Sequence, residues 1–369
     1  MRRYLGSAAG WSKDERVMMR RGKGSEADIV ALSQYLMREY GGTTTRILRN
    51  GRSAIAMALR YGLERTGGEV IINGFTCFAV YQGVREAGFK PVFADIDSTT
   101  LNFTIETLEQ VLTKKTRAVI VQNTLGNVID IREIEEFCQA HGLLLIEDLA
   151  HCVGRVYPDG RETGTVGNVT VFSFGKEKAT DAVTGGAVVF RREPVKLPPL
   201  RSLEAPRGAA ARRLRWYPTL GQIYRKTAPV GLGRILMRIW LKLGVVQRSA
   251  DDVVDYARMG MLPVSAKIAL ERLKNRHESG KKPLREFYLV KEREKVLSRL
   301  ERAGYDFRGF WYEKPVSPER YYYRVRFDEA ACPVATDVAR KIVNLPNYYS
   351  EAELEPARKI IEEYLDDED

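Results

Sequence analysis

The chain has 369 residues, 44% of them hydrophobic and 29% charged, which is typical of a globular protein with a large core and two or three domains. No run reaches the ~18 apolar residues of a membrane span, and the polar start does not resemble a signal peptide, so we expect a cytoplasmic protein. The cysteines lie far apart and form no C-x-x-C pair, which favours reduced thiols and argues against a metal site; they are Cys77, Cys138, Cys152 and Cys332.

The net charge of +11 comes almost entirely from one segment. Residues 201–249 contain eleven Lys/Arg and a single acid, Glu204, which is a local surplus of ten. No nucleic-acid-binding motif accompanies this segment, so we do not expect a nucleic-acid partner.

Two helices are expected before the first strand of the main series. Residues 26–40 have helical periodicity, and Asn50-Gly51 predicts a turn after which Ser53 caps a helix that runs to about Gly62. A glycine turn before a helix offers free N–H groups and the positive end of the helix dipole, which suits a phosphate.

From residue 69 onwards, apolar strands alternate with helices. Strands are expected at 69–74, 91–96, 117–122, 143–148 and 169–174. Helices are expected at 78–88, 104–113 and 131–142. This βαβ series predicts an α/β fold, with a doubly wound, mostly parallel sheet that is covered on both faces.

Ligands of such sheets bind beyond the carboxyl ends of the strands. The residues at those ends are Phe75-Thr76-Cys77, Asn123, Asp148 with His151, and residues 173–178. No G-x-G-x-x-G follows the first strand, which disfavours a dinucleotide-dependent dehydrogenase.

The loop after the strand at 169–174 carries two lysines, Lys176 and Lys178. A lysine that is desolvated at the mouth of a buried sheet loses its proton easily and becomes a nucleophile, able to form a Schiff base with an aldehyde cofactor. The alternative is a surface loop with two solvated lysines. Asp148 has two interpretations as well, because it either caps the following turn or pairs, ionised, with a protonated ring nitrogen.

Three motifs occur in an order that is specific when they are taken together: Asp148-Leu-Ala-His151, Ser173-Phe-Gly-Lys-Glu-Lys178 and Gly185-Gly186-Ala-Val-Val. With the flanking blocks, they resemble the DegT/DnrJ/StrS-type sugar aminotransferases, which are pyridoxal-phosphate-dependent enzymes of fold type I. The resemblance covers roughly residues 28–190 and 255–365. It implies an aspartate-aminotransferase-like fold with a smaller C-terminal α+β domain.

The resemblance also implies roles for individual residues. Lys178 is the Schiff-base lysine, Asp148 pairs with the pyridine nitrogen, and His151 stands beside the cofactor. Lys178, Asp148 and His151 are thus the catalytic set. The residues implied to bind pyridoxal 5'-phosphate are Gly51, Arg52, Ser53, Cys77, Asn123, Asp148, His151, Ser173 and Lys178.

Three positions depart from the family pattern. Arg52 stands in the phosphate turn, where it either contacts the phosphate or points to solvent. Cys77 stands where an aromatic residue usually stacks on the ring, which leaves Phe75 or Phe78 as substitutes. Tyr256 replaces an asparagine of a cross-subunit contact. Apart from these positions, Lys176 remains the alternative to Lys178 as the lysine that forms the Schiff base.

Residues 194–250 do not match the family pattern. The first part, 197–218, is expected to be a basic loop, and residues 231–246 an amphipathic helix that suits a membrane interface. One hypothesis is peripheral contact with anionic lipid at the inner membrane surface; the alternative is that the helix packs on a partner subunit or forms a lid. Further on, residues 285–304 are expected to form a helix and 321–327 a strand.

We therefore expect a pyridoxal-phosphate-dependent aminotransferase that moves an amino group from glutamate or glutamine to a nucleotide-linked keto sugar in polysaccharide biosynthesis. The family implies a homodimer. The expected division is a large domain at 1–260 and a linking helix with a small domain at 261–369. The alternatives are another pyridoxal-phosphate-dependent reaction on a sugar or amino acid, and a catalytically silent membrane-associated or regulatory protein of the same fold.

Overall fold

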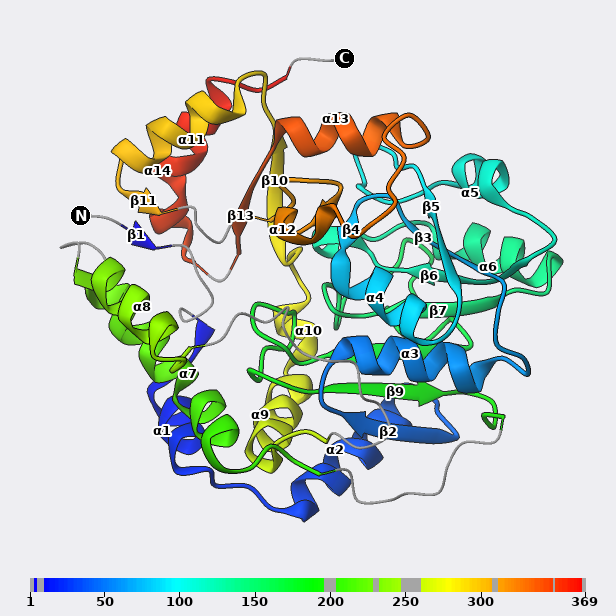
Figure 1. Cartoon of the computed structure of the whole chain (residues 1–369), viewed down its shortest axis with the longest axis horizontal. Helices are drawn as coiled ribbons and strands as arrows, with labels where there is room; N and C mark the ends of the chain where they lie inside the picture. The colour runs from blue at the N-terminus through cyan, green and yellow to red at the C-terminus, as the bar shows by residue number, and fades with distance from the viewer. Residues whose placement is uncertain are drawn as a thin grey trace.

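A seven-stranded sheet forms the centre of the molecule (Figure 1). The structure is a computed structural model, and it describes residues 3–4, 10–195, 204–227, 232–246, 260–306, 311–347 and 349–366. In spatial order its strands are β2 (Thr44–Leu48), β9 (Gly186–Phe190), β8 (Val169–Ser173), β7 (Leu144–Asp148), β6 (Thr116–Val121), β3 (Glu69–Asn73) and β5 (Lys90–Ala94). Only β9 runs against its neighbours, and the other pairs are parallel. The prediction of a mostly parallel sheet is confirmed.

Helices cover both faces of this sheet, because most of its strands are apolar on both sides. The first face packs on α3 (Gly51–Gly62) and α4 (Phe78–Glu86). The second face packs on α5 (Ile105–Val111), α6 (Ile131–Ala140), α2 (Glu26–Glu39) and α9 (Pro263–Lys274). The sheet is therefore doubly wound, as predicted.

The C-terminal part is built on the antiparallel pair β10 (Arg285–Leu289) and β13 (Ile342–Pro346). Around this pair lie α11 (Arg293–Arg302), α13 (Pro333–Lys341) and α14 (Glu351–Glu362), and the short elements β11 (Tyr305–Asp306), β12 (Val316–Ser317) and α12 (Glu319–Tyr322). Asp95, after β5, caps α13 by accepting the N–H groups of Val334 and Ala335 at 2.9 and 2.8 Å. This cap ties the C-terminal part to the main sheet, while the division at residue 260 stays a prediction.

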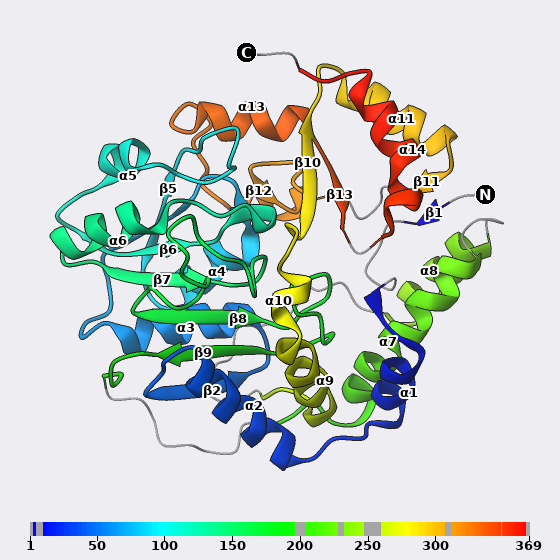
Figure 2. The ribbon, with the colours of Figure 1, turned by 180° about the vertical axis from the view of Figure 1, so that it is seen from behind.

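The remaining elements join these layers. Two are short strands: β1 (Arg3–Tyr4) pairs with β11, and β4 (Thr76–Cys77) pairs with β12. The others are α1 (Lys13–Arg21), the 3-10 turn Thr124–Gly126, α7 (Gly208–Thr227), α8 (Leu232–Lys242) and α10 (Arg276–Ser279). Figure 2 shows β10, α10 and α9 in a line between the main sheet and the group of α1, α7 and α8.

Three expected elements differ from the structure. The expected loop at 197–218 contains the start of α7, in which Pro218 is a buried interior residue. The expected helix at 285–304 is β10 followed by α11, because the first apolar run pairs with β13. The expected strand at 321–327 is wrong, because its first two residues end the short helix α12 and residues 323–327 form a turn and irregular chain. Tyr321 and Val325 pack in the same apolar cluster.

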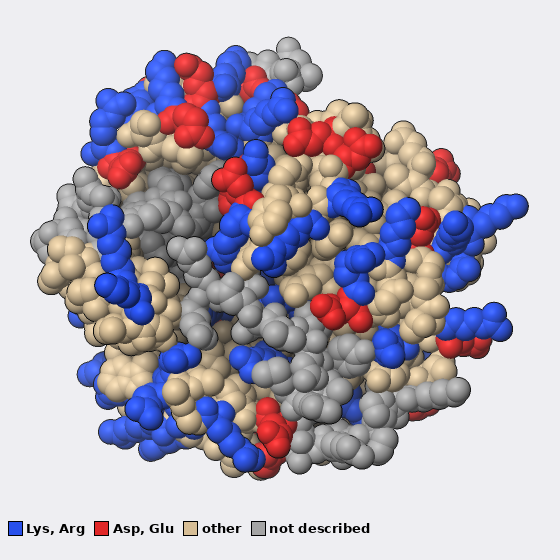
Figure 3. All heavy atoms as spheres, viewed as in Figure 1, with Lys and Arg blue, Asp and Glu red and all other residues tan. Residues whose placement is uncertain are grey.

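Within the described residues, no helix is long and apolar enough to cross a membrane. The expected amphipathic helix at 231–246 exists as α8, which lies beside α7 at the left edge of the molecule in Figure 1. Figure 3 shows uncharged surface and blue Lys/Arg side chains in this region. Residue 231, parts of the segment 194–250, and Tyr256 lie outside the described residues.

Candidate active site

Lys178 and His151 meet at the carboxyl edge of the sheet. Lys178 lies in the loop between β8 and β9, and His151 follows β7 by three residues. The Nζ atom of Lys178 is 3.1 Å from Nε2 of His151. Lys176 lies elsewhere, with its Nζ 3.9 Å from the centroid of the Tyr217 ring on α7. The structure thus separates the two lysines that the sequence left as rivals.

The hydrogen bonds of His151 assign the proton in this pair. Nδ1 of His151 accepts the backbone N–H of Leu125 at 3.3 Å, so this nitrogen is unprotonated and the neutral ring carries its hydrogen on Nε2. Burial, and then the charges of Lys178 and Arg285, hold the pKa of His151 well below its usual value. The ring therefore presents Nε2 to the Lys178 amine, which it contacts at the edge of the sheet.

Asp148 ends β7 and is 3% exposed. One of its oxygens accepts the N–H of Ala150 at 3.0 Å, so the residue caps the turn, as one interpretation of the sequence expected. Burial raises its pKa to about 6, against the opposing effects of the Ala150 hydrogen bond and of Lys178. A protonated ring nitrogen beside Asp148 would stabilise the ionised form, so the second interpretation is compatible with the first.

The start of α3 has buried polar atoms that lack partners. Asn50, rather than Ser53, caps this helix by accepting the Ser53 N–H at 2.9 Å, because Ser53 already lies in the first turn. Within the described residues, the Ser53 hydroxyl and the Asn50 amide nitrogen are buried without a hydrogen-bond partner. Such atoms at a helix N-terminus fit a phosphate, which supplies acceptor oxygens and negative charge.

Ser173 approaches the same turn closely. A Cβ atom at Gly51 would lie 2.8 Å from the Cβ of Ser173, so only glycine permits this contact. Arg52 is 7% exposed and donates to Gln82 at 3.0 Å, which rules out the expected alternative of a solvated arginine. The structure therefore brings together Gly51, Ser53 and Ser173 around one turn, and these residues fit the phosphate of pyridoxal phosphate.

Two of the predicted cofactor contacts, Asn123 and Cys77, have protein partners in the structure and stay predictions. Asn123 is fully buried, and its amide binds the Tyr157 hydroxyl at 3.1 Å and the Ile129 N–H at 3.2 Å. Cys77 is half-buried, and its sulfur accepts the Ala79 N–H at the start of α4. The amide of Asn123 is thus held within the core.

The aromatic side chain over the candidate site is Trp311, which the sequence did not suggest. Its ring centroid lies 5.1 Å from that of His151 and 4.9 Å from Nζ of Lys178. Its indole N–H donates to Glu177, the neighbour of Lys178, at 3.0 Å. Phe75 instead packs on Tyr312 and Phe78 on Tyr321, so neither of the expected aromatic substitutes takes this position.

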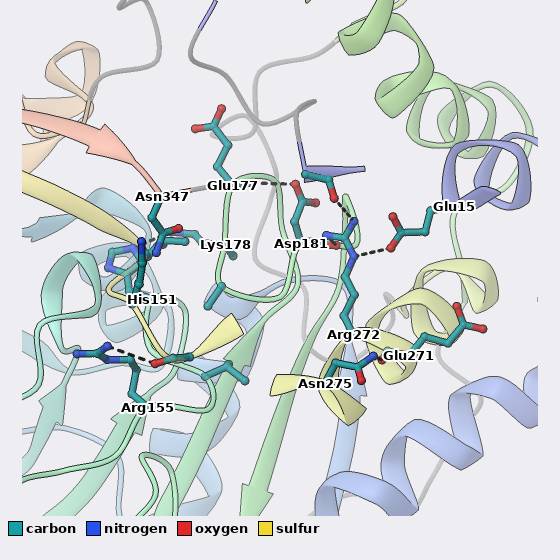
Figure 4. A pocket seen from close by; sticks show the side chains of 16 residues that line it. Glu15, His151, Arg155, Glu177, Lys178, Asp181, Glu271, Arg272, Asn275 and Asn347 are labelled. Carbon is teal, nitrogen blue, oxygen red and sulfur yellow. Dashed lines mark hydrogen bonds and ion pairs between the residues drawn. The ribbon is translucent and has the colours of Figure 1, made fainter. Parts of the chain in front are cut away.

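A cavity of about 500 Å³ opens beside Lys178 and His151 (Figure 4). His151, Lys178 and Asn347 lie on one side, while Glu15 of α1 and Arg272 of α9 lie opposite. Arg272 bonds Glu15 at 2.8 Å and the carbonyl oxygens of Asp181 and Gly10 at 2.7 and 3.0 Å, which fixes the N-terminal segment as a wall.

Arg155 also lines the cavity. It donates to the carbonyl oxygens of Gly280 and Lys281 at 3.2 and 3.3 Å. Its Nε atom is buried with no partner among the described residues.

Comparison with known proteins shows that the fold is shared. The match to solved structures is extensive at low identity. Helicobacter pylori PseC, an aminotransferase involved in the biosynthesis of pseudoaminic acid, superposes with a TM-score of 0.64, 16% identity and coverage of 96% of this chain and 98% of that one. The E. coli GDP-4-keto-6-deoxy-D-mannose-3-dehydratase with bound hydrated PLP gives a TM-score of 0.66, 15% identity and coverage of 98% and 99%. The fold is that of the fold-type I pyridoxal-phosphate enzymes.

The sequence places the chain within that class. A model of the DegT/DnrJ/EryC1/StrS aminotransferase family matches residues 19–198. GDP-perosamine synthase of Vibrio cholerae is 26% identical over 306 residues, which cover 81% of this chain and 80% of that protein. Over residues 19–198 the chain belongs to the DegT/DnrJ/EryC1/StrS aminotransferase family, and the family match ends within the first residues of the unusual segment 194–250.

Proposed function

We propose that this chain is a pyridoxal-phosphate-dependent aminotransferase that transfers an amino group from glutamate or glutamine to a nucleotide-linked keto sugar. The observation that carries the proposal is the contact of 3.1 Å between Nε2 of His151 and Nζ of Lys178 at the carboxyl edge of the sheet. The family match supports the same reaction, as do two relatives: GDP-perosamine synthase and PseC, an aminotransferase involved in the biosynthesis of pseudoaminic acid.

The cofactor, when bound, supplies an aldehyde for covalent attachment and an electron sink for the bonds of the attached amine. Lys178 is the residue to which it attaches, and Asp148 is the carboxylate that keeps a proton on the ring nitrogen. Ser53, Ser173 and the N–H groups of the α3 turn hold the phosphate and fix the ring in place.

With the cofactor bound and Lys178 released from it, the Nζ atom would be a free base beside the reacting carbons. In the first half of the reaction it would take the proton that the donor carbon loses, and in the second half it would deliver a proton to the carbon of the acceptor sugar. His151 holds this amine in position by donating from Nε2, and Leu125 fixes the tautomer of the ring. The cavity beside Lys178 receives the substrates, and Arg155 lies in its lining.

We further propose that the chain is a homodimer, as the family resemblance implied, and light scattering of the purified protein tests this state directly.

The test of the reaction is spectroscopic. Protein loaded with pyridoxal phosphate should lose its visible absorbance when glutamate or glutamine is added, and a nucleotide-linked keto sugar should restore it. If the loaded protein keeps its absorbance with every amino donor, the catalytically silent alternative replaces this proposal.

A further inference from the structure

The α7–α8 pair carries charge of one sign only. Residues 208–242 contain eight Lys/Arg and no Asp or Glu. Such a segment is attracted to anionic surfaces over a distance of about one Debye length, ~10 Å at moderate salt. The charge alone does not distinguish among anionic partners.

The outer face of α8 is apolar as well. Leu232, Ile235, Ile239 and Leu243 follow each other at intervals of three and four residues, which places them on one side of the helix. Their exposed fractions are 47%, 55%, 45% and 69%. On the neighbouring helix α7, Trp216 and Ile223 are 40% and 38% exposed. Contiguous exposure of large apolar side chains marks an interaction surface.

Basic side chains flank this apolar stripe. Arg238 and Lys242 are exposed, and each follows an exposed isoleucine by three residues, which puts it beside the stripe. No carboxylate of the described residues forms an ion pair with either cation. Figure 3 shows the uncharged surface over α8 next to blue side chains at the left edge of the molecule.

We propose that this face of α8 docks on a phospholipid bilayer with anionic headgroups, with the helix lying in the plane of the interface. An apolar stripe with basic flanks complements the acyl boundary and the headgroups together. At 11 residues the helix is about 16 Å long, too short to span a bilayer. A second copy fits less well, because a two-fold contact through this face brings only positive charges together.

Docking in this way places the candidate site beside the membrane. α7 packs against α1, which supplies Glu15 to the cavity wall. Tyr217 of α7 contacts Lys176 of the loop that carries Lys178. The α7–α8 pair is therefore joined to both walls of the site, and a substrate held at the bilayer surface would lie near it.

The test is flotation of the full-length protein with vesicles of phosphatidylglycerol and phosphatidylcholine, compared with vesicles of phosphatidylcholine alone. The protein should float with the anionic vesicles and be released by high salt. Ile235→Asp/Ile239→Asp should abolish flotation, and Arg238→Gln/Lys242→Gln should weaken binding on the order of tenfold. The matched control is Val30→Asp/Val156→Asp, which changes two valines that are each 52% exposed elsewhere and should bind like the wild type.

Circular dichroism and light scattering complete the experiment. All variants should keep the wild-type thermal midpoint and oligomeric state, because the changed side chains are exposed. Failure of the wild type to float with anionic vesicles overturns the proposal, as does flotation of Ile235→Asp/Ile239→Asp at the wild-type level. A change of oligomeric state in that variant also overturns it, since the face would then lie between two copies of this chain.

Discussion

The Nζ atom of Lys178 lies 3.1 Å from Nε2 of His151, while Nδ1 on the other side of the same ring accepts the N–H of Leu125. These two contacts fix the tautomer of the histidine, whose hydrogen on Nε2 faces the amine of Lys178. One backbone N–H in the turn after β6 thus orients the ring that contacts the lysine of the loop after β8. The arrangement explains why Lys178 and not Lys176 is suited to hold an aldehyde cofactor.

Removing the histidine should slow the reaction without removing the cofactor. We expect His151→Ala to lower kcat by on the order of 10²-fold, because Lys178 loses the donor that positions its lone pair. His151→Gln should recover part of this loss, since an amide N–H can replace the ring N–H. Steady-state kinetics at saturating cofactor measure both changes; equal rates for His151→Ala and the wild type would remove His151 from the mechanism.

The depressed pKa of His151 has a consequence for the pH profile. The ring stays neutral below the ordinary histidine pKa of 6.5, because burial and the neighbouring cations disfavour its charged form. The profile of kcat against pH should therefore show no inflection near pH 6.5 that comes from His151. The His151→Gln variant should give a profile of the same shape as the wild type in this range. An inflection that disappears in this variant would show a titrating histidine and contradict the assigned tautomer.

Asp148 should make cofactor affinity depend on pH. Its pKa is about 6 in the protein without cofactor, and a protonated ring nitrogen lowers that value in the complex. Binding must then release a proton below pH 6, so the Kd for pyridoxal phosphate should rise as the pH falls, by about tenfold per pH unit at most. In Asp148→Asn this contribution should vanish, and the difference between the two curves measures it. Parallel curves would exclude Asp148 as the partner of the ring.

Ser53 offers a test that separates binding from folding. Its hydroxyl has no hydrogen-bond partner among the described residues, so Ser53→Ala should leave the thermal midpoint of the cofactor-free protein unchanged. The Kd for pyridoxal phosphate should rise about tenfold, the value of one hydrogen bond to a charged group of about 1.5 kcal/mol. Ser25→Ala is the control, because it removes a helix cap and should lower stability without changing the Kd. An unchanged Kd in Ser53→Ala would place the phosphate elsewhere.

Trp311 should act on turnover through the loop that carries Lys178. In Trp311→Phe the hydrogen bond to Glu177 is lost while an aromatic ring remains near His151, so we expect a several-fold lower kcat with cofactor retained. Trp311→Ala removes the ring as well and should also weaken cofactor binding. Absorbance titration and steady-state rates measure the two effects. Wild-type values in both variants would leave Trp311 with a structural role only.

The sequence predicted the sheet and the motifs at its edge because those features are local. Apolar runs bounded by turns mark the strands around Asp148 and Ser173. The resemblance to the family then favours Lys178 over Lys176, which the sequence left as a rival. Trp311 could not be predicted in this way, since it lies 133 residues after Lys178 and reaches the site only when the C-terminal part packs on the sheet.

The errors arose where tertiary contacts override local preference. Pro218 suggested a loop, but the residues around it form α7, and the proline is buried within that helix. Residues 285–289 extended an apparently helical pattern, yet they pair with β13 because a short apolar run suits a strand equally well. The hydrogen bonds of Asn123 likewise depend on Tyr157, a residue that no motif links to it.

The most direct test of the central claim is to find the lysine that carries the cofactor. The protein is loaded with pyridoxal phosphate, reduced with borohydride, digested, and examined by mass spectrometry. We predict a pyridoxyl group on Lys178 alone, and no labelled peptide in Lys178→Ala, while Lys176→Ala labels like the wild type. Labelling at Lys176, or at no lysine, would contradict the account.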